Sequence, residues 1–153
     1  MTGKEYLERL RRMRRTVNLL QENYNILKGD IYSLKAIDYS KTRVSGSHAS
    51  DSMADLIAVL DEQKKELTKE WASYIKLRAE ATRYISLVNN QDYRMMLMMR
   101  YVNNKSWYAI SKCIGYERTQ TYRIHKEAIN DFEEKFNEIT KMEQNGTSKC
   151  DIV

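Results

Sequence analysis

The sequence predicts an all-α protein, with a long N-terminal helical hairpin or coiled coil followed by a C-terminal helix-turn-helix. The 153 residues contain no proline, and charged residues make up 31% of them and are spread along the chain. Apolar residues recur in alternating steps of four and three over two long segments, which is the pattern of paired helices. With 42% hydrophobic residues, this composition suits long amphipathic helices better than disorder or a sheet-rich sandwich.

The first repeat predicts a helix from about Lys4 to Ala36. A sustained period of 3.5 residues indicates a left-handed supercoil with a partner helix. The apolar positions of this repeat are Tyr6, Leu10, Met13, Val17, Leu20, Tyr24, Leu27, Ile31 and Leu34.

Residues 38–52 are rich in Ser, Thr, Lys, Gly and His, a composition typical of a flexible linker or loop. Asp51 or Ser52 is then a candidate N-cap for a second long helix over about 53–89. The repeat of this helix runs through Met53, Ile57, Leu60, Lys64, Leu67, Trp71, Tyr74, Arg78, Ala81, Ile85 and Val88.

The two repeats can close on each other as an antiparallel hairpin, or they can pair with a second chain. We favour a hairpin that also forms a homodimer, because a two-helix hairpin alone leaves much of Trp71, Tyr74 and Leu77 in water. Residues 1–89 are therefore expected to be a coiled-coil and oligomerisation element.

A third helix is predicted from about Asp92 to Val102, ending at Asn103-Asn104. Residues 95–99 make it apolar nearly all round, as expected of a helix buried inside a small bundle. After it, Ser106 is the candidate N-cap of the next helix and Trp107 its apolar anchor.

Residues 106–129 predict two helices joined by a tight turn at Gly115, where glycine can adopt the left-handed conformation that ends a helix. The second helix begins near Glu117, continues through Phe136 and leads into a polar tail, residues 137–153, that is expected to be disordered. Apolar positions at helical spacing predict the inner face of both helices: Ile110, Ile114, Tyr116, Thr121, Ile124 and Ala128.

The outer face of the second helix carries side chains that can bind DNA. In a helix-turn-helix the second helix lies in the major groove. Arginine can bond to guanine and glutamine to adenine, each pair contributing about 1–3 kcal/mol of discrimination. The candidate contacts on this helix are Arg118, Thr119, Gln120, Tyr122, Arg123 and Lys126, with Lys126 expected at a phosphate. Lys105 and Ser106, at the start of the first helix, are further candidate DNA contacts. The alternative is a plain helical bundle with solvated basic residues.

A basic cluster begins the chain, which has a formal charge of +5 and a pI near 9.1. Basic residues at a helix end can bind phosphates without regard to sequence. They can equally be a solvated coiled-coil flank that matches the acidic start of the second helix. The cluster contains Lys4 and the candidate phosphate contacts Arg9, Arg11, Arg12, Arg14 and Arg15.

Other classes of site have little support in the sequence. His48 and His125 lack a second ligand at metal spacing, and Cys113 and Cys150 lie far apart, so no metal site is predicted. No carboxylate pair, Ser-His-Asp set or glycine-rich phosphate loop is evident, so neither an enzyme nor a cofactor is expected. No stretch approaches the length of a membrane span and no signal peptide is evident, which predicts a soluble cytoplasmic protein without membrane association.

The last third of the chain contains a characteristic set of residues: Leu97-x-x-Arg100-Tyr101, Lys105-Ser-Trp107, Ile110, Ile114-Gly-Tyr116, Gln120, Tyr122-Arg-Ile-His125 and Ala128-Ile129. This set resembles the C-terminal pattern of a family of small proteins from phages and integrative elements of Gram-positive bacteria. That pattern is similar to region 4 of the sigma-70 family, and relatives include phage late-operon transcriptional activators of the RinA and ArpU types. Residues 45–55 also look like this family, so the resemblance extends over about residues 5–135.

The resemblance implies that residues 90–136 form a region 4-like DNA-binding domain. By this resemblance, the positions that read DNA in region 4 correspond to Arg118, Thr119, Gln120, Tyr122 and Arg123. Two positions depart from the pattern, since Glu117 stands where Ser or Thr usually caps the recognition helix and Tyr122 is bulkier than a typical contact residue. Both departures bear on whether the target is like a promoter −35 element.

We therefore expect a sequence-specific transcriptional regulator that binds double-stranded DNA, in particular an activator of phage or mobile-element genes. The long helices would form a homodimer or contact host RNA polymerase. One alternative is a DNA-packaging component similar to a small terminase subunit, which would form rings of many subunits. Another is a helical adaptor that binds a sigma factor or polymerase and has no affinity for DNA.

Overall fold

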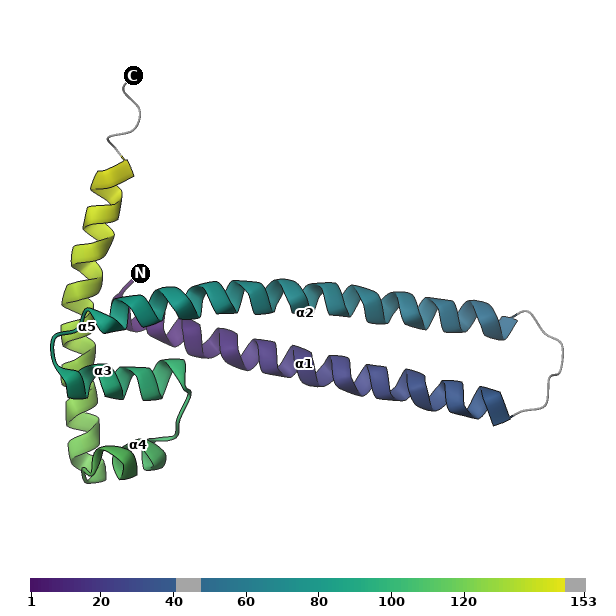
Figure 1. The fold of residues 1–153 in the computed structure, drawn as a ribbon, viewed down its shortest axis with the longest axis horizontal. Helices are drawn as coiled ribbons and strands as arrows, with labels where there is room; N and C mark the ends of the chain where they lie inside the picture. The colour runs from purple at the N-terminus through teal and green to yellow at the C-terminus, as the bar shows by residue number, and fades with distance from the viewer. Residues whose placement is uncertain (41–47, 148–153) are drawn as a thin grey trace, which may run out of the picture. The chain divides into compact units, whose positions relative to one another are not determined.

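The computed structural model describes residues 1–40 and 48–147, with side chains for 1–36 and 52–143. These residues form helices and turns without a strand, so the predicted all-α fold with a long hairpin followed by shorter C-terminal helices is confirmed (Figure 1). The elements are α1 (Gly3–Ser40), α2 (His48–Ser86), α3 (Gln91–Leu97), the π-helical segment η1 (Met98–Val102), α4 (Trp107–Ile114) and α5 (Arg118–Thr147). None of the described helices is long and apolar enough to cross a bilayer.

The chain forms two compact units. One consists of residues 14–74, here called the hairpin unit, and the other combines Met1–Met13 with the chain from Ile75 onward, here called the composite unit. The first turns of α1 therefore belong to the same unit as the C-terminal helices. The sequence repeats do not indicate this division, because they run through both ends of the hairpin without a break.

In the hairpin unit, α1 and α2 pair with each other in antiparallel orientation. The Trp71 Nε1–H donates to Gln21 Oε1 at 3.3 Å, and Arg14 donates to the Tyr74 hydroxyl at 3.3 Å. From Arg14 to Gln21 along α1 the partner moves back from Tyr74 to Trp71 along α2, as the antiparallel alternative requires. Repeat positions toward the other end differ in burial, since Leu34 and Ile57 are exposed and Ile31 is buried.

Both long helices extend further toward the loop between them than predicted, whereas α2 ends at Ser86, before the predicted end at about residue 89. α2 begins at His48, so the predicted N-cap at Asp51 or Ser52 is wrong. Residues 38–40 and 48–52 of the predicted linker are helical, and the rest of it, residues 41–47, lies outside the described residues. Ser, Thr, Lys and His each cost a helix less than about 0.7 kcal/mol, so without a proline this composition is a weak stop signal.

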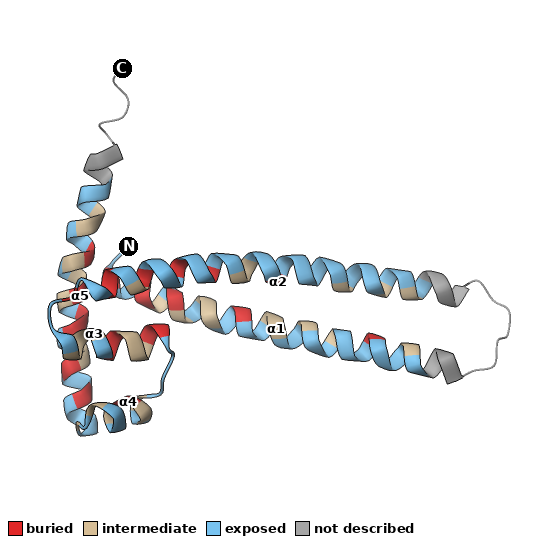
Figure 2. Cartoon of the chain, viewed as in Figure 1, coloured by how far each residue is buried: buried red, intermediate tan, exposed pale blue. Residues whose placement is uncertain are grey.

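The core of the composite unit brings together the start of α1, the end of α2 and the middle of α5 (Figure 2). The ring of Tyr6 lies 5.1 Å from that of Phe136, and the ring of Tyr84 lies 5.9 Å from it. Burial raises the pKa of Tyr84 to about 12. Other buried side chains of these segments and of the turn after α2 include Leu7, Leu10, Leu77, Ala81, Ile85, Val88, Ala128, Ile129 and Phe132.

Gly3 permits a close approach between α1 and α5. A Cβ at this position would lie 3.0 Å from Glu133 Oε2 and 3.1 Å from Phe132 Cδ1. The same Glu133 oxygen accepts a hydrogen bond from the backbone N–H of Lys4 at 3.1 Å. A carboxylate at a helix N-terminus is also favoured by the helix dipole, so this contact fixes the start of α1 on α5.

The third helix changes character along its length. Asn90 caps α3 and accepts from the N–H of Asp92 at 2.8 Å, and the chain becomes π-helical at Met98. The prediction of a helix from about Asp92 to Val102 thus holds apart from the π segment. The expectation that it is buried all round is wrong for Met95, which is 38% exposed.

α5 continues beyond residue 136, where the sequence predicts a polar, disordered tail, and ends at Thr147. Its polar side chains have partners on α2, because Glu143 lies 3.5 Å from the Arg83 guanidinium and accepts from the Tyr84 hydroxyl at 3.3 Å. These contacts stabilise the end of α5, a segment whose polar composition alone favours fraying. Residues 148–153 of the predicted tail lie outside the described residues.

Candidate nucleic-acid interface

The predicted two-helix motif is present, with the caps that its sequence indicates. The Ser106 hydroxyl accepts from the N–H of Ala109 at 3.2 Å and so caps α4. Gly115 ends this helix at a φ of 77°, and its N–H donates to the Ser111 carbonyl at 3.0 Å. Glycine takes this left-handed conformation without the clash that a Cβ would cause. The turn between α4 and α5 is therefore set by local chemistry.

The inner face of the motif is also as predicted. Ile110 and Ile124 are buried together with Met96 of α3. Thr121 is buried as well, and its hydroxyl donates to the carbonyl of Glu117 at 3.0 Å, which satisfies the polar group inside the first turn of α5. Ala128 continues the buried face one turn further.

Burial of this face turns the opposite side of α5 toward solvent. All of the predicted contact residues on α5 are exposed: Arg118, Thr119, Gln120, Tyr122, Arg123 and Lys126. Arg123 also has a neighbour of opposite charge, with its Nε 3.8 Å from Glu127 Oε1. Both side chains are largely exposed, and surface ion pairs contribute only about 0–1 kcal/mol, so Arg123 remains available to another anion.

Tyr122 has a packing role that the other five lack. Its ring centroid lies 4.9 Å from that of Trp107, and 41% of the residue is exposed. Trp107 also contacts His125, at 4.7 Å edge-on, and the Arg100 guanidinium, which lies 4.1 Å from the indole centroid. Tyr122 therefore joins the outer face of α5 to an aromatic cluster at the start of α4.

His125 lies inside this cluster as a neutral side chain. Its Nε2 is 2.9 Å from the hydroxyl of Tyr101, whose pKa is raised to about 12 by burial. Burial, together with the positive charges of Arg100, Lys4 and Arg11, lowers the pKa of His125 to about 4. These neighbours and the hydrogen bond make a packing role the simplest account of this histidine.

The depressed pKa of His125 predicts a loss of stability in mild acid. The unfolded chain takes up a proton near the ordinary pKa of about 6.5, whereas the folded protein does not until about pH 4, so stability falls as the pH drops through this window. Between pH 7.5 and 5.0 the loss from this residue is about 2 kcal/mol at most. Urea unfolding of the wild type and His125→Gln at both pH values measures it. The variant is expected to lose less stability between the two, and an equal loss in both proteins would contradict the assignment.

The N-terminal basic residues do not share one environment. The Arg14 guanidinium lies 5.9 Å from the Trp71 ring centroid and 5.5 Å from that of Tyr74, so it takes part in packing within the hairpin unit. Arg11 donates from Nε to Asn104 Oδ1 at 3.2 Å within the composite unit. Arg9, Arg12 and Arg15 are exposed, as are Lys4 and the candidate contacts Lys105 and Ser106.

Two residues near the motif, Arg100 and Asn104, were not among the predicted site residues. Arg100 packs on Trp107 and donates to the carbonyl of Lys105 at 3.2 Å. Asn104 adopts a φ of 56° in the turn before α4. An Asn-Asn pair between two helices is a signal for such a left-handed residue, because asparagine tolerates this region better than most side chains.

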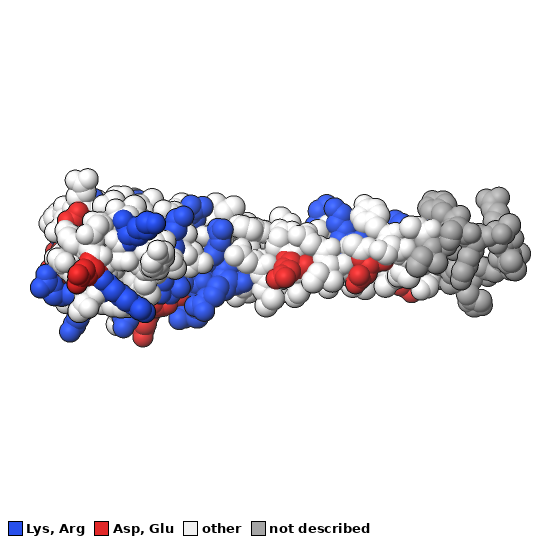
Figure 3. Space-filling view, turned by 90° about the horizontal axis from the view of Figure 1, so that it is seen from below, with Lys and Arg blue, Asp and Glu red and all other residues white. Residues whose placement is uncertain are grey.

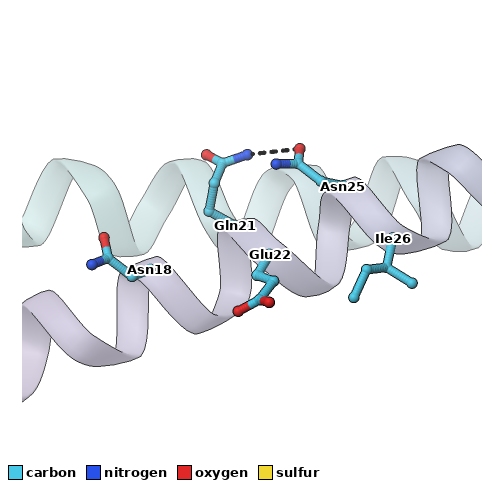
Figure 4. Close-up of a pocket in the computed structure, with 5 residues that line it drawn as sticks. All are labelled: Asn18, Gln21, Glu22, Asn25 and Ile26. Atoms are coloured by element: carbon cyan, nitrogen blue, oxygen red, sulfur yellow. Dashed lines mark hydrogen bonds between the residues drawn. The ribbon is translucent and has the colours of Figure 1, made fainter.

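Figure 4 shows a surface hollow on α1 in the hairpin unit, lined by Asn18, Gln21, Glu22, Asn25 and Ile26. Gln21 donates to Asn25 Oδ1 at 3.2 Å, so two of the amides that line the hollow are hydrogen-bonded to each other. The hollow is formed by one helix and has a single titratable side chain. Within the described part of the chain, no group of three or more His, Cys, Asp or Glu residues is placed to hold a metal ion.

The described residues thus form a long helical hairpin and a capped helix-turn-helix with an exposed basic outer face. Residues 33–133 match the family model described as a protein of unknown function, DUF1492, and the chain belongs to this family. The match runs from the end of α1 to the middle of α5 and so includes the whole helix-turn-helix. No curated protein and no solved structure matches the chain.

Proposed function

We propose that the protein is a sequence-specific DNA-binding transcriptional regulator that places the start of α5 in the major groove. The observation that carries this proposal is the exposed row of polar and basic side chains directly after the Gly115 turn. The inner face of the same helix is packed, so the row is presented by a rigid element. Rigid presentation favours recognition because less conformational freedom is lost on binding.

The side chains of this row have complementary tasks. Arg118, Gln120 and Arg123 carry donors that match the base edges of guanine and adenine in the major groove. Thr119 and Lys126 suit phosphate oxygens, which position the protein without reading sequence. Tyr122 has a smaller part of its surface available because its ring packs on Trp107.

The charge distribution favours a polyanionic partner. The chain carries a formal charge of +5, and Figure 3 shows Lys and Arg side chains gathered, with a few acidic ones among them, on the composite unit. Such a surface raises the association rate with DNA and makes affinity depend on salt.

The biological setting of this proposal rests on resemblance. The motif resembles sigma-70 region 4 and the RinA- and ArpU-type activators, which suggests activation of phage or mobile-element genes in the cytoplasm of a bacterial host. In this proposal the hairpin unit forms a homodimer and can contact RNA polymerase. Exposed Leu19 and Ile26, seven residues apart on α1, support a second copy as the partner, because this spacing repeats along one side of a coiled-coil helix.

In vitro selection from a random DNA pool tests the proposal directly. The purified full chain is expected to enrich one motif after a few rounds, and a palindrome or direct repeat in that motif would give the geometry of the dimer. Failure to enrich any sequence with folded protein at low salt would contradict sequence-specific binding. That result would favour the alternative of a helical adaptor, to be tested by polymerase pull-down.

A further inference from the structure

The turn that leads into α4 is joined to the start of α1 by one side-chain contact. Asn104 is the only non-glycine residue with positive φ in the described part of the chain, at 56°. Its side-chain oxygen accepts from Arg11 Nε at 3.2 Å, across 93 residues of sequence. This hydrogen bond uses one donor of Arg11 and leaves its terminal amino groups for another acceptor.

A second arginine lies at the same turn. Arg100 stacks its guanidinium 4.1 Å from the centroid of Trp107 and donates from one terminal nitrogen to the carbonyl of Lys105 at 3.2 Å. Burial and the nearby positive charge of Arg11 lower the pKa of Arg100. Glu8 lies near enough to offset part of that charge, yet no carboxylate among the described side chains forms an ion pair within 4.0 Å of either guanidinium.

Two fixed guanidinium groups near each other, without a paired carboxylate, favour an anion between or beside them. Each is held by a hydrogen bond and Arg100 also by a ring, so little side-chain entropy remains to be lost on binding. The exposed Lys105 and the positive end of α4 lie at the same turn and add to the attraction.

The turn that carries Arg100 and Lys105 lies close to the recognition helix, α5. Trp107 contacts Arg100 and also Tyr122 of α5, so one ring connects Arg100 to the outer face of α5. When the recognition helix of such a motif lies in the major groove, the first helix of the motif, here α4, lies beside the phosphate backbone.

We propose that Arg11, Arg100 and Lys105 form a binding site for a backbone phosphate of the bound DNA, so that the start of α1 is part of the DNA-binding surface. This proposal rests on the proposed function and deepens it. Arg11 thus has a role that differs from that of Arg14, which is used in packing, although both belong to the same run of basic residues.

The test compares Arg11→Gln with the wild type in DNA binding over a range of salt concentrations, using the selected site as the probe. Losing one phosphate contact flattens the slope of log affinity against log salt by up to about 0.9. We expect a loss of affinity of about 3- to 10-fold at about 0.15 M salt, with the selected sequence unchanged. Arg78→Gln, which removes an exposed arginine of α2 in the same unit, is the charge-matched control and should leave the slope unchanged.

A second variant separates placement of Arg11 from strain in the turn. Asn104→Gly keeps the left-handed turn, because glycine adopts positive φ freely, but removes the acceptor of Arg11. It should keep the melting temperature and flatten the slope by less than Arg11→Gln does.

The outcomes distinguish this proposal from the proposed function. If the wild type binds a selected site and Arg11→Gln retains the wild-type affinity and slope, the proposed phosphate-binding site is wrong and the proposed function stands. The proposed phosphate-binding site is also wrong if Arg11→Gln lowers the melting temperature but leaves the slope unchanged, since Arg11 would then only stabilise the contact between α1 and the turn. If the wild type binds no DNA at any salt, both proposals fail together.

Discussion

Phe132→Ala is expected to lower the free energy of unfolding of the composite unit by about 3–5 kcal/mol, the range for truncating a buried phenylalanine. The side chain is fully buried, lies 5.9 Å from the ring of Phe136, and packs where Gly3 lets α1 approach α5. Removing it leaves a cavity under the start of α1 that a neighbouring glycine cannot fill. Urea denaturation measures the change.

The two tryptophans allow the two units to be followed separately, because Trp71 belongs to the hairpin unit and Trp107 to the composite unit. In single-tryptophan backgrounds, Phe132→Ala should shift the Trp107 transition more than the Trp71 transition. Met142→Ala is the matched control on the same helix, since Met142 is 71% exposed and should change stability by less than about 0.5 kcal/mol. A shift below about 1 kcal/mol for Phe132→Ala would show that the contact between α1 and α5 is not a true core.

Arg123→Ala is expected to weaken binding to the selected DNA site by about 5- to 150-fold, the equivalent of the roughly 1–3 kcal/mol that a bidentate arginine–guanine contact contributes. Arg123 is exposed on the outer face of α5, so the substitution should not disturb the fold. Fluorescence anisotropy with the selected duplex and a scrambled duplex measures the effect on specific and non-specific binding. The selected duplex should lose far more affinity than the scrambled one.

Two comparisons make the result of Arg123→Ala interpretable. Arg78→Ala removes the same charge from an exposed position on α2 and should weaken both duplexes slightly and equally. Circular dichroism of Arg123→Ala should match the wild type. A folded Arg123→Ala that keeps its preference for the selected duplex would exclude this residue from base reading and would weaken the assignment of the whole row.

Local chemistry explains why much of the fold could be predicted from the sequence. The helical repeats depend only on spacing, and Ser106 and Gly115 act on their own helix ends, so both the hairpin and the helix-turn-helix follow from short stretches. The exposed face of α5 then follows from the burial of Thr121 and Ile124 on the opposite side.

What could not be predicted depends on residues far apart in the chain. Nothing in the spacing of Tyr6 indicates that it packs on Phe136, and the basic run gives no sign that Arg11 bonds to Asn104 whereas Arg14 packs on Trp71. Such differences arise only when separate helices meet. The extension of α5 has the same origin, because its polar end is held by α2.

The division of the chain also has a consequence for the order of folding. The composite unit is discontinuous, since the whole hairpin unit, residues 14–74, separates Met13 from Ile75. Closing a flexible loop of this length is entropically costly, but an antiparallel hairpin that forms first brings Arg14 next to Tyr74 and removes most of that cost. We therefore expect the hairpin unit to act as the nucleus, with the start of α1 lacking its contacts with α5 until the last third of the chain has been synthesised.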